Sequence, residues 1–180
     1  MEDAHLYLQD FNNVPGQGYF AIFDGHAGKF AAEWCRDNMN RILSEELNVC
    51  PHMDVREVMR NAFLKADEQL EAESRSAGVR SGCTAVTSLI RLESDDSDQN
   101  KSRRRVLYTA NVGDARSVLW YVDTSVCRLQ LLTMNVSRGG KAIRLTYDHK
   151  GSDEFESKRI TEKGGFLLNN RVNGACNLCV

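Results

Sequence analysis

A short apolar run that ends in three chemically active residues constrains this chain most. Residues 19–23, Tyr-Phe-Ala-Ile-Phe, have the length and aromatic content of a buried strand. Asp24, Gly25 and His26 follow at once. Asp offers a hard oxygen ligand, Gly lets its carbonyl approach an ion, and His exchanges protons near neutral pH. Taken alone, the triplet favours an ordinary turn in which His26 caps the next helix.

A second acidic group near the start of the chain changes that balance. Glu2 and Asp3 precede a strand-like piece at Leu6–Leu8. The turn residues 12–16 separate this piece from the run at 19–23, so the two strands are expected to be neighbours. Their acidic ends would then meet at one place.

Two segments of helical periodicity follow, at residues 28–47 and 54–75. Asp54 is the predicted N-cap of the second helix. The apolar stripe predicted for the first helix contains Phe30, Ala31, Trp34, Cys35, Asn38, Ile42 and Leu47. The stripe predicted for the second contains Val55, Val58, Met59, Ala62, Phe63, Ala66 and Leu70. We expect the two helices to pack as an antiparallel pair on one face of a sheet.

Later strands are predicted at 83–92, 106–112 and 117–120. The polar stretch 93–105, acidic and then basic, favours a solvated hairpin loop over a localisation or docking signal. A short helix is predicted over 153–163 with Gly164 as its stop, followed by a hairpin over 166–172. Long helices between strand pairs indicate an α+β fold of mainly antiparallel sheet.

Composition excludes several classes of function. A chain of 180 residues is the length of one domain, and a net charge of −2 makes no electrostatic case for nucleic acid or a membrane surface. No apolar run is long enough to span a bilayer. Six scattered cysteines indicate free thiols, with the Cys176–Cys179 spacing incidental. We expect a monomer in the cytoplasm, the nucleus or both.

Taken in order, the motifs resemble those of the metal-dependent protein phosphatases of type 2C, the PPM family. Residues 1–5 and 20–28 are similar to its opening motifs, and the stretch from Asp24 to Cys35 is similar to fungal members. Further similar motifs follow in the family's order at 81–85, 109–116, 145–150, 156–165 and 171–174. This ordered series disfavours a generic α/β binding domain with no relation to phosphatases.

The resemblance implies a fold and a reaction. The fold would be a partial αββα sandwich, in which antiparallel helices flank antiparallel sheets, with residues 1–180 forming one partial phosphatase domain. The reaction would be hydrolysis of phosphoserine and phosphothreonine in phosphorylated protein substrates by a metal-activated water. Two or more Mg²⁺ or Mn²⁺ ions would be required.

The resemblance also assigns roles to residues of this chain. Asp24 would bridge two ions, and Glu2 would ligate one of them with Asp3 in support. Gly25 would offer its backbone carbonyl. His26 would protonate the departing serine or threonine oxygen.

Two further residues are less sharply assigned. Asp114 matches a position linked to a third, weaker metal site, and a plain turn carboxylate is an equal alternative. Arg116 is expected to be structural. Residues 121–137 and 175–180 match nothing in the family pattern.

The family's phosphate-gripping arginine would precede Met1, and its later aspartates would follow Val180. The sequence thus leaves open a shortened phosphatase and a catalytically inactive, truncated phosphatase-like protein that binds or regulates a partner.

Overall fold

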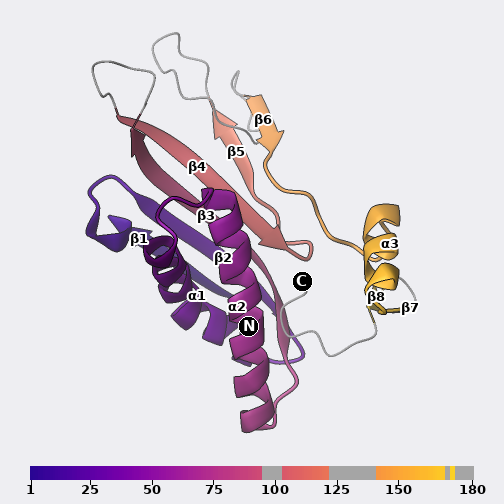
Figure 1. Ribbon diagram of the computed structural model, residues 1–180. Coiled ribbons are helices and arrows are strands. Elements are labelled where there is room, and N and C mark those ends of the chain that lie inside the picture. Colours follow the sequence, from indigo (N-terminus) through magenta and orange to yellow (C-terminus); the bar gives the residue numbers. More distant parts are fainter. Residues whose placement is uncertain (95–102, 122–140, 169–170, 173–180) are drawn as a thin grey trace.

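The core of the molecule is one four-stranded antiparallel sheet. The computed structural model describes residues 1–94, 103–121, 141–168 and 171–172. Within them, the strands of this sheet lie in the order β1 (Ala4–Gln9), β2 (Gly18–His26), β3 (Gly82–Ser94) and β4 (Arg103–Val112). Each pairs with its neighbour in antiparallel register (Figure 1). The α+β class predicted from the sequence is confirmed.

Two long helices, α1 (Phe30–Val49) and α2 (Val55–Ala77), cover one face of this sheet (Figure 1). Only residues 50–54 join them, and so short a connection makes them antiparallel neighbours. The predicted cap is present, because the Asp54 carboxylate accepts a hydrogen bond from the Arg56 backbone N–H at 2.8 Å. Gly78, with φ of +67°, ends α2 in the left-handed conformation typical of helix C-termini.

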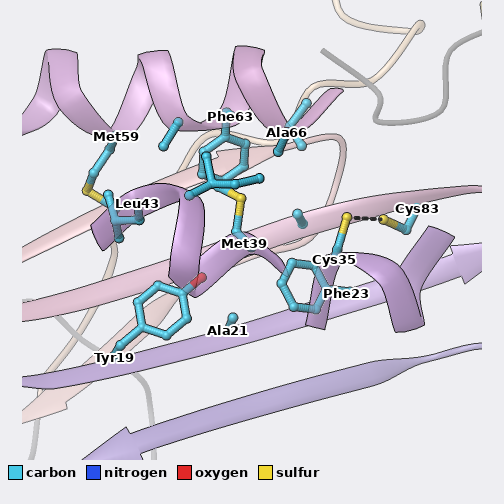
Figure 2. Close-up of a cluster of buried hydrophobic side chains, with 14 of the residues drawn as sticks. Tyr19, Ala21, Phe23, Cys35, Met39, Leu43, Met59, Phe63, Ala66 and Cys83 are labelled. Carbon is cyan, nitrogen blue, oxygen red and sulfur yellow. Dashed lines mark hydrogen bonds between the residues drawn. The ribbon is translucent and has the colours of Figure 1, made fainter. Parts of the chain in front are cut away.

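The hydrophobic core lies between these helices and the sheet. Alternate residues of β2, namely Tyr19, Ala21 and Phe23, are at most 4% exposed and point toward the helices. Figure 2 shows them beneath a layer of side chains from α1 and α2 that includes Cys35, Met39, Leu43, Met59, Phe63 and Ala66.

The buried residues of α2 were predicted more accurately than those of α1. All seven residues predicted for α2 are buried. For α1, the inclusion of Asn38 is wrong, since its amide donates instead to the Trp34 carbonyl, while Ala32, Met39 and Leu43 are buried. The reason is that α1 packs against both the sheet and α2, so its buried arc is wider than one stripe.

Strands β3 and β4 extend beyond their predicted ends. Glu93 lies opposite Arg104, and Ser94 lies opposite Arg103, so the acidic and basic halves of the supposed loop begin as paired strand. The Tyr108 hydroxyl also donates to Glu93 at 2.6 Å. The predicted loop is therefore too long at both ends.

Smaller elements complete the described part of the chain. They are the short 3₁₀ helix η1 (Phe11–Asn13), the pair β5 (Val118–Tyr121) with β6 (Lys141–Arg144), helix α3 (Glu154–Glu162), and the pair β7 (Leu167–Leu168) with β8 (Arg171–Val172). Helix α3 and the last hairpin confirm the sequence prediction. The insert predicted at 121–137 begins one residue too early, because Tyr121 ends β5 opposite Lys141. Residues 122–137 and the tail at 175–180 lie outside the described residues.

The described ranges bear on the predictions about the cysteines and about membrane-spanning segments. Cys35, Cys50 and Cys83 are free thiols there, as predicted. No helix in these ranges has the length and apolar character needed to cross a membrane.

Candidate metal centre

The end of strand β2 presents Asp24 on the face of the sheet that the helices leave open. Tyr19, Ala21 and Phe23 face the helices, so strand alternation puts Asp24 on the opposite face, where it is exposed. Asp24 lies opposite Thr84 of β3. The carboxylate is therefore held by paired backbone on a rigid strand and remains open to solvent.

The start of the chain passes directly beside Gly25. A Cβ atom built on Gly25 would overlap the Glu2 carbonyl oxygen, so only a glycine allows this approach. The register Ala4 to Phe23, continued by one residue, sets Asp3 opposite Asp24. The two acidic ends thus lie side by side at the level of the backbone, and their assignment as metal ligands stays a prediction.

The turn after β4 lies on the other side of Thr84. Gly113 has φ of +76°, and a Cβ built on it would lie 2.6 Å from Thr84 Cγ2. Thr84 is therefore between Asp24 and the turn that carries Asp114. The Asp114 carboxylate lies 3.4 Å from Lys150 Nζ. Asp114 is thus an ion-paired turn carboxylate in this structure, and its assignment to a third metal site stays a prediction.

His26 ends β2 and is exposed. Within the described ranges its side chain makes no hydrogen bond or ion pair. It does not cap α1, whose first turn is capped from a distant residue: the buried Ser81 hydroxyl accepts from the Ala31 backbone N–H at 3.1 Å. The helix-cap alternative for His26 is wrong.

The cap from Ser81 was missed because the two residues are 50 positions apart. The only sequence signal was the family motif at 81–85. The turn between β2 and α1 contains Ala27 with φ of +56°, a left-handed conformation that is unusual for a residue with a Cβ.

Arg116 and Asp148 form the charge network behind this end of the sheet. Arg116 Nε lies 3.1 Å from an Asp148 carboxylate oxygen, and Arg144 pairs with the same carboxylate. The hydrogen bond from Arg116, with further attraction from Arg144, lowers the pKa of Asp148. The backbone N–H of His149 donates to the Gly113 carbonyl at 2.9 Å. Arg116 thus helps to fasten residues 145–150 to the turn beside Thr84, in keeping with its expected structural role.

The donors at this end of the sheet suit a hard divalent ion in kind. Carboxylate and carbonyl oxygens are the ligands that Mg²⁺ and Mn²⁺ prefer. The Thr84 hydroxyl is buried and has no hydrogen-bond partner among the described residues. In number the donors fall short, since no group of three or more His, Cys, Asp or Glu side chains converges within the described ranges. The residues therefore match a hard ion in the type of donor, but not in the number of side chains that converge.

Comparison with known proteins identifies the family. The model of the protein phosphatase 2C family matches residues 1–179, and the chain belongs to this family. The family consists of metal-dependent serine/threonine phosphatases.

Two yeast relatives share much of the sequence. Protein phosphatase 2C homolog 1 of Saccharomyces cerevisiae is 40% identical over 97% of this chain and 57% of its own length. The homolog 1 of Schizosaccharomyces pombe is 39% identical over 97% of this chain and 43% of its own. The chain thus spans about half the length of these relatives.

A solved structure supports the fold. The serine-threonine phosphatase 2C from Toxoplasma gondii superposes with a TM-score of 0.64 at 20% identity, over 97% of this chain and 56% of that one. Both the sheet and its helix pair therefore follow an established architecture.

Proposed function

We propose that residues 1–180 form part of a phosphatase domain that removes phosphate from phosphoserine and phosphothreonine in proteins, using Mg²⁺ or Mn²⁺. One observation carries the proposal. In a chain of this family, the Glu2 backbone, the Asp24–Gly25 pair and the turn with Asp114 gather at one end of the sheet around Thr84.

Each residue of the group has a distinct task in this proposal. A bound divalent ion would neutralise charge on the phosphoryl oxygens and acidify a water. Asp24 would hold the ion from the rigid end of β2. Glu2, Asp3 and the Gly25 carbonyl would add oxygen donors from the adjoining backbone.

His26 would complete the reaction from the end of the same strand. Its side chain is exposed, and neither ring nitrogen makes a hydrogen bond to the described residues. The ring is therefore accessible to a substrate. It would give a proton to the departing serine or threonine oxygen.

A second function, binding without hydrolysis, is favoured by the donor count. Asp114 is engaged by Lys150, and no three acidic or imidazole side chains converge in the described ranges. Mg²⁺ gives up its water reluctantly, so few anionic ligands mean weak binding. We therefore expect the 180-residue chain by itself to hydrolyse phosphopeptides poorly.

Asp24→Asn tests the site, because it removes the charge while keeping the size. We expect at least a tenfold loss of Mn²⁺ affinity by calorimetry, and loss of any Mn²⁺-dependent turnover of a phosphothreonine peptide. Asp37→Asn, at a solvent-exposed carboxylate of α1, is the matched control and should change neither quantity.

The outcomes separate the two functions. Turnover that requires Asp24 supports the phosphatase. Mn²⁺ binding that requires Asp24 without turnover supports the assigned centre and means that residues 1–180 by themselves bind without hydrolysis. Binding and turnover that both survive Asp24→Asn contradict the assigned centre.

A further inference from the structure

A second candidate site lies on the helix side of the sheet. A cavity of about 390 Å³ opens between α2, the end of β4 and α3. Arg56 and Arg60, one helical turn apart on α2, line one wall, and Arg159 of α3 lines another. Figure 1 shows α3 set off from the sheet, on the side toward which β4 ends. The cavity therefore joins parts of the chain about a hundred residues apart.

The charges around this cavity are unbalanced. Glu156 is the one carboxylate among its lining residues, against three guanidinium groups. Arg159 Nη2 already lies 2.8 Å from Glu156, and Arg56 pairs with Asp54. Arg60 is exposed and makes no ion pair within the described ranges. An anion entering the cavity would meet a guanidinium whose charge is uncompensated.

Part of the lining of the cavity is apolar. Phe63 is buried, and Leu64 is 43% exposed although it is a large apolar residue. A small inorganic anion would leave that surface uncovered, whereas a peptide would cover it with a neighbouring side chain. The planar guanidinium fork suits carboxylate and phosphate oxygens in particular. The combination indicates a peptide that carries anionic side chains next to an apolar one.

The position of the cavity connects it to the candidate metal centre. Asn111 and Val112 line the cavity and directly precede the Gly113–Asp114 turn. The Asn111 amide is itself held by the Tyr147 carbonyl at 2.7 Å, so this wall is fixed to the same loop as the centre. The cavity and the Gly113–Asp114 turn are thus adjacent along β4.

We propose that this cavity binds an acidic segment of the protein substrate that carries an apolar side chain beside its carboxylates, with Arg60 receiving one carboxylate. The identification of the segment as part of a substrate rests on the proposed phosphatase function. The binding of the acidic peptide itself does not.

The test measures binding by fluorescence anisotropy with the full 180-residue chain. The probe is a labelled peptide with three glutamates around one leucine. Its counterparts carry glutamine, which removes the charge, and phosphoserine, which distinguishes phosphate from carboxylate as the preferred anion. The glutamate peptide should bind at least tenfold more tightly than the glutamine peptide, and tight binding of the phosphoserine peptide alone would overturn the assignment of a carboxylate.

Arg60→Glu should weaken binding of the acidic peptide roughly tenfold or more, since it replaces a charge-assisted hydrogen bond with repulsion. Arg75→Glu makes the same change of charge on an exposed arginine near the far end of α2, and it should alter binding less than twofold. Arg60→Lys keeps the charge without the planar fork and should give an intermediate loss. Circular dichroism and the melting temperature show that each variant is folded.

Equal losses in Arg60→Glu and Arg75→Glu would overturn the proposal, because binding would then follow net charge alone. Equal affinity for the glutamine peptide would overturn it as well. Failure of the phosphatase is separately visible, since absent turnover with intact Arg60-dependent binding removes only the description of the peptide as substrate.

Discussion

The two faces of strand β2 differ in nearly every physical respect. On the helix side, Tyr19 and Phe23 are 0% exposed. On the open side, Phe20 and Ile22 are 41% and 55% exposed, and Phe20 stacks on Tyr7 with ring centroids 5.0 Å apart. Asp24 belongs to the open side. One face thus holds the fold together, while the other carries the candidate chemistry where side chains stay accessible.

This division has a simple cause in strand geometry. Successive side chains point to opposite faces, so one strand can serve both purposes without compromise at either. The backbone of Asp24 is fixed by its pairing with Thr84 of β3, and the preceding residue Phe23 also pairs with Ala4 of β1. Rigidity therefore reaches the open face through the backbone, whereas burial of side chains is confined to the helix side.

The largest expected effect comes from truncating the buried face. Phe23→Ala should lower the free energy of unfolding by about 3–5 kcal/mol, because it leaves a cavity under the helices. Phe20→Ala removes the same ring from the open face and should cost less than half as much. Urea unfolding measures both. If Phe23→Ala does not fold, Phe23→Leu provides the milder comparison, and equal losses on the two faces would contradict the division.

A smaller loss of unfolding free energy is expected for a substitution at Gly25, near the end of β2. Gly25→Ala should cost about 1–3 kcal/mol, because the new Cβ would push the Glu2 backbone away. It should also reduce Mn²⁺ affinity, since it separates the two acidic ends. Gly78→Ala is the control: a Cβ there meets nothing within 4 Å, so any loss of stability comes from its left-handed φ and leaves Mn²⁺ binding unchanged. If Gly25→Ala folds and its Mn²⁺ affinity is unaltered, Glu2 does not take part in binding the ion.

The charge network beside the open face should make stability depend on acidity. Because Arg116 lowers the pKa of Asp148, the stabilisation is fully present above the ordinary carboxyl pKa near 4. It is lost as the pH falls through the lowered pKa of the folded state. Asp148→Asn should remove roughly 1 kcal/mol at pH 7, where both arginines lose their partner. It should also flatten the acid limb of the curve of stability against pH, and an unchanged acid limb would assign the dependence to other carboxylates.

The smallest effect is expected for a polar exchange on the open face. Ile22→Thr keeps a β-branched side chain and should change the free energy of unfolding by less than about 1 kcal/mol. Ala21→Thr, on the neighbouring buried position, should cost distinctly more because a hydroxyl enters the core. Chemical denaturation of the two variants measures the contrast. A large loss for Ile22→Thr would mean that the open face is packed in solution.

Most of the local elements followed from the sequence, although β6 was not predicted and β3 and β4 extend beyond their predicted ends. Helix α2 has its cap at Asp54, its stripe at helical spacing and its stop at Gly78, and each signal lies within a few residues of the structure it specifies. Helix α3 shows the same kind of cap at Asp153. Such elements are predictable because their hydrogen bonds and apolar periodicity are local.

The acidic strand ends were also visible in advance, because Asp24–His26 and Glu2–Asp3 stand out from their apolar neighbours. By itself, then, the sequence determined the elements, the family and the residues to consider for the centre. Tertiary structure decided how these residues meet: the fit of Gly25 against Glu2, the place of Thr84 beside Gly113, and the engagement of Asp114 by Lys150. It also brought Arg60 and Arg159 to one cavity, although no motif connects them. The physical reason is that close approach and charge pairing depend on packing between distant segments, which local periodicity does not encode.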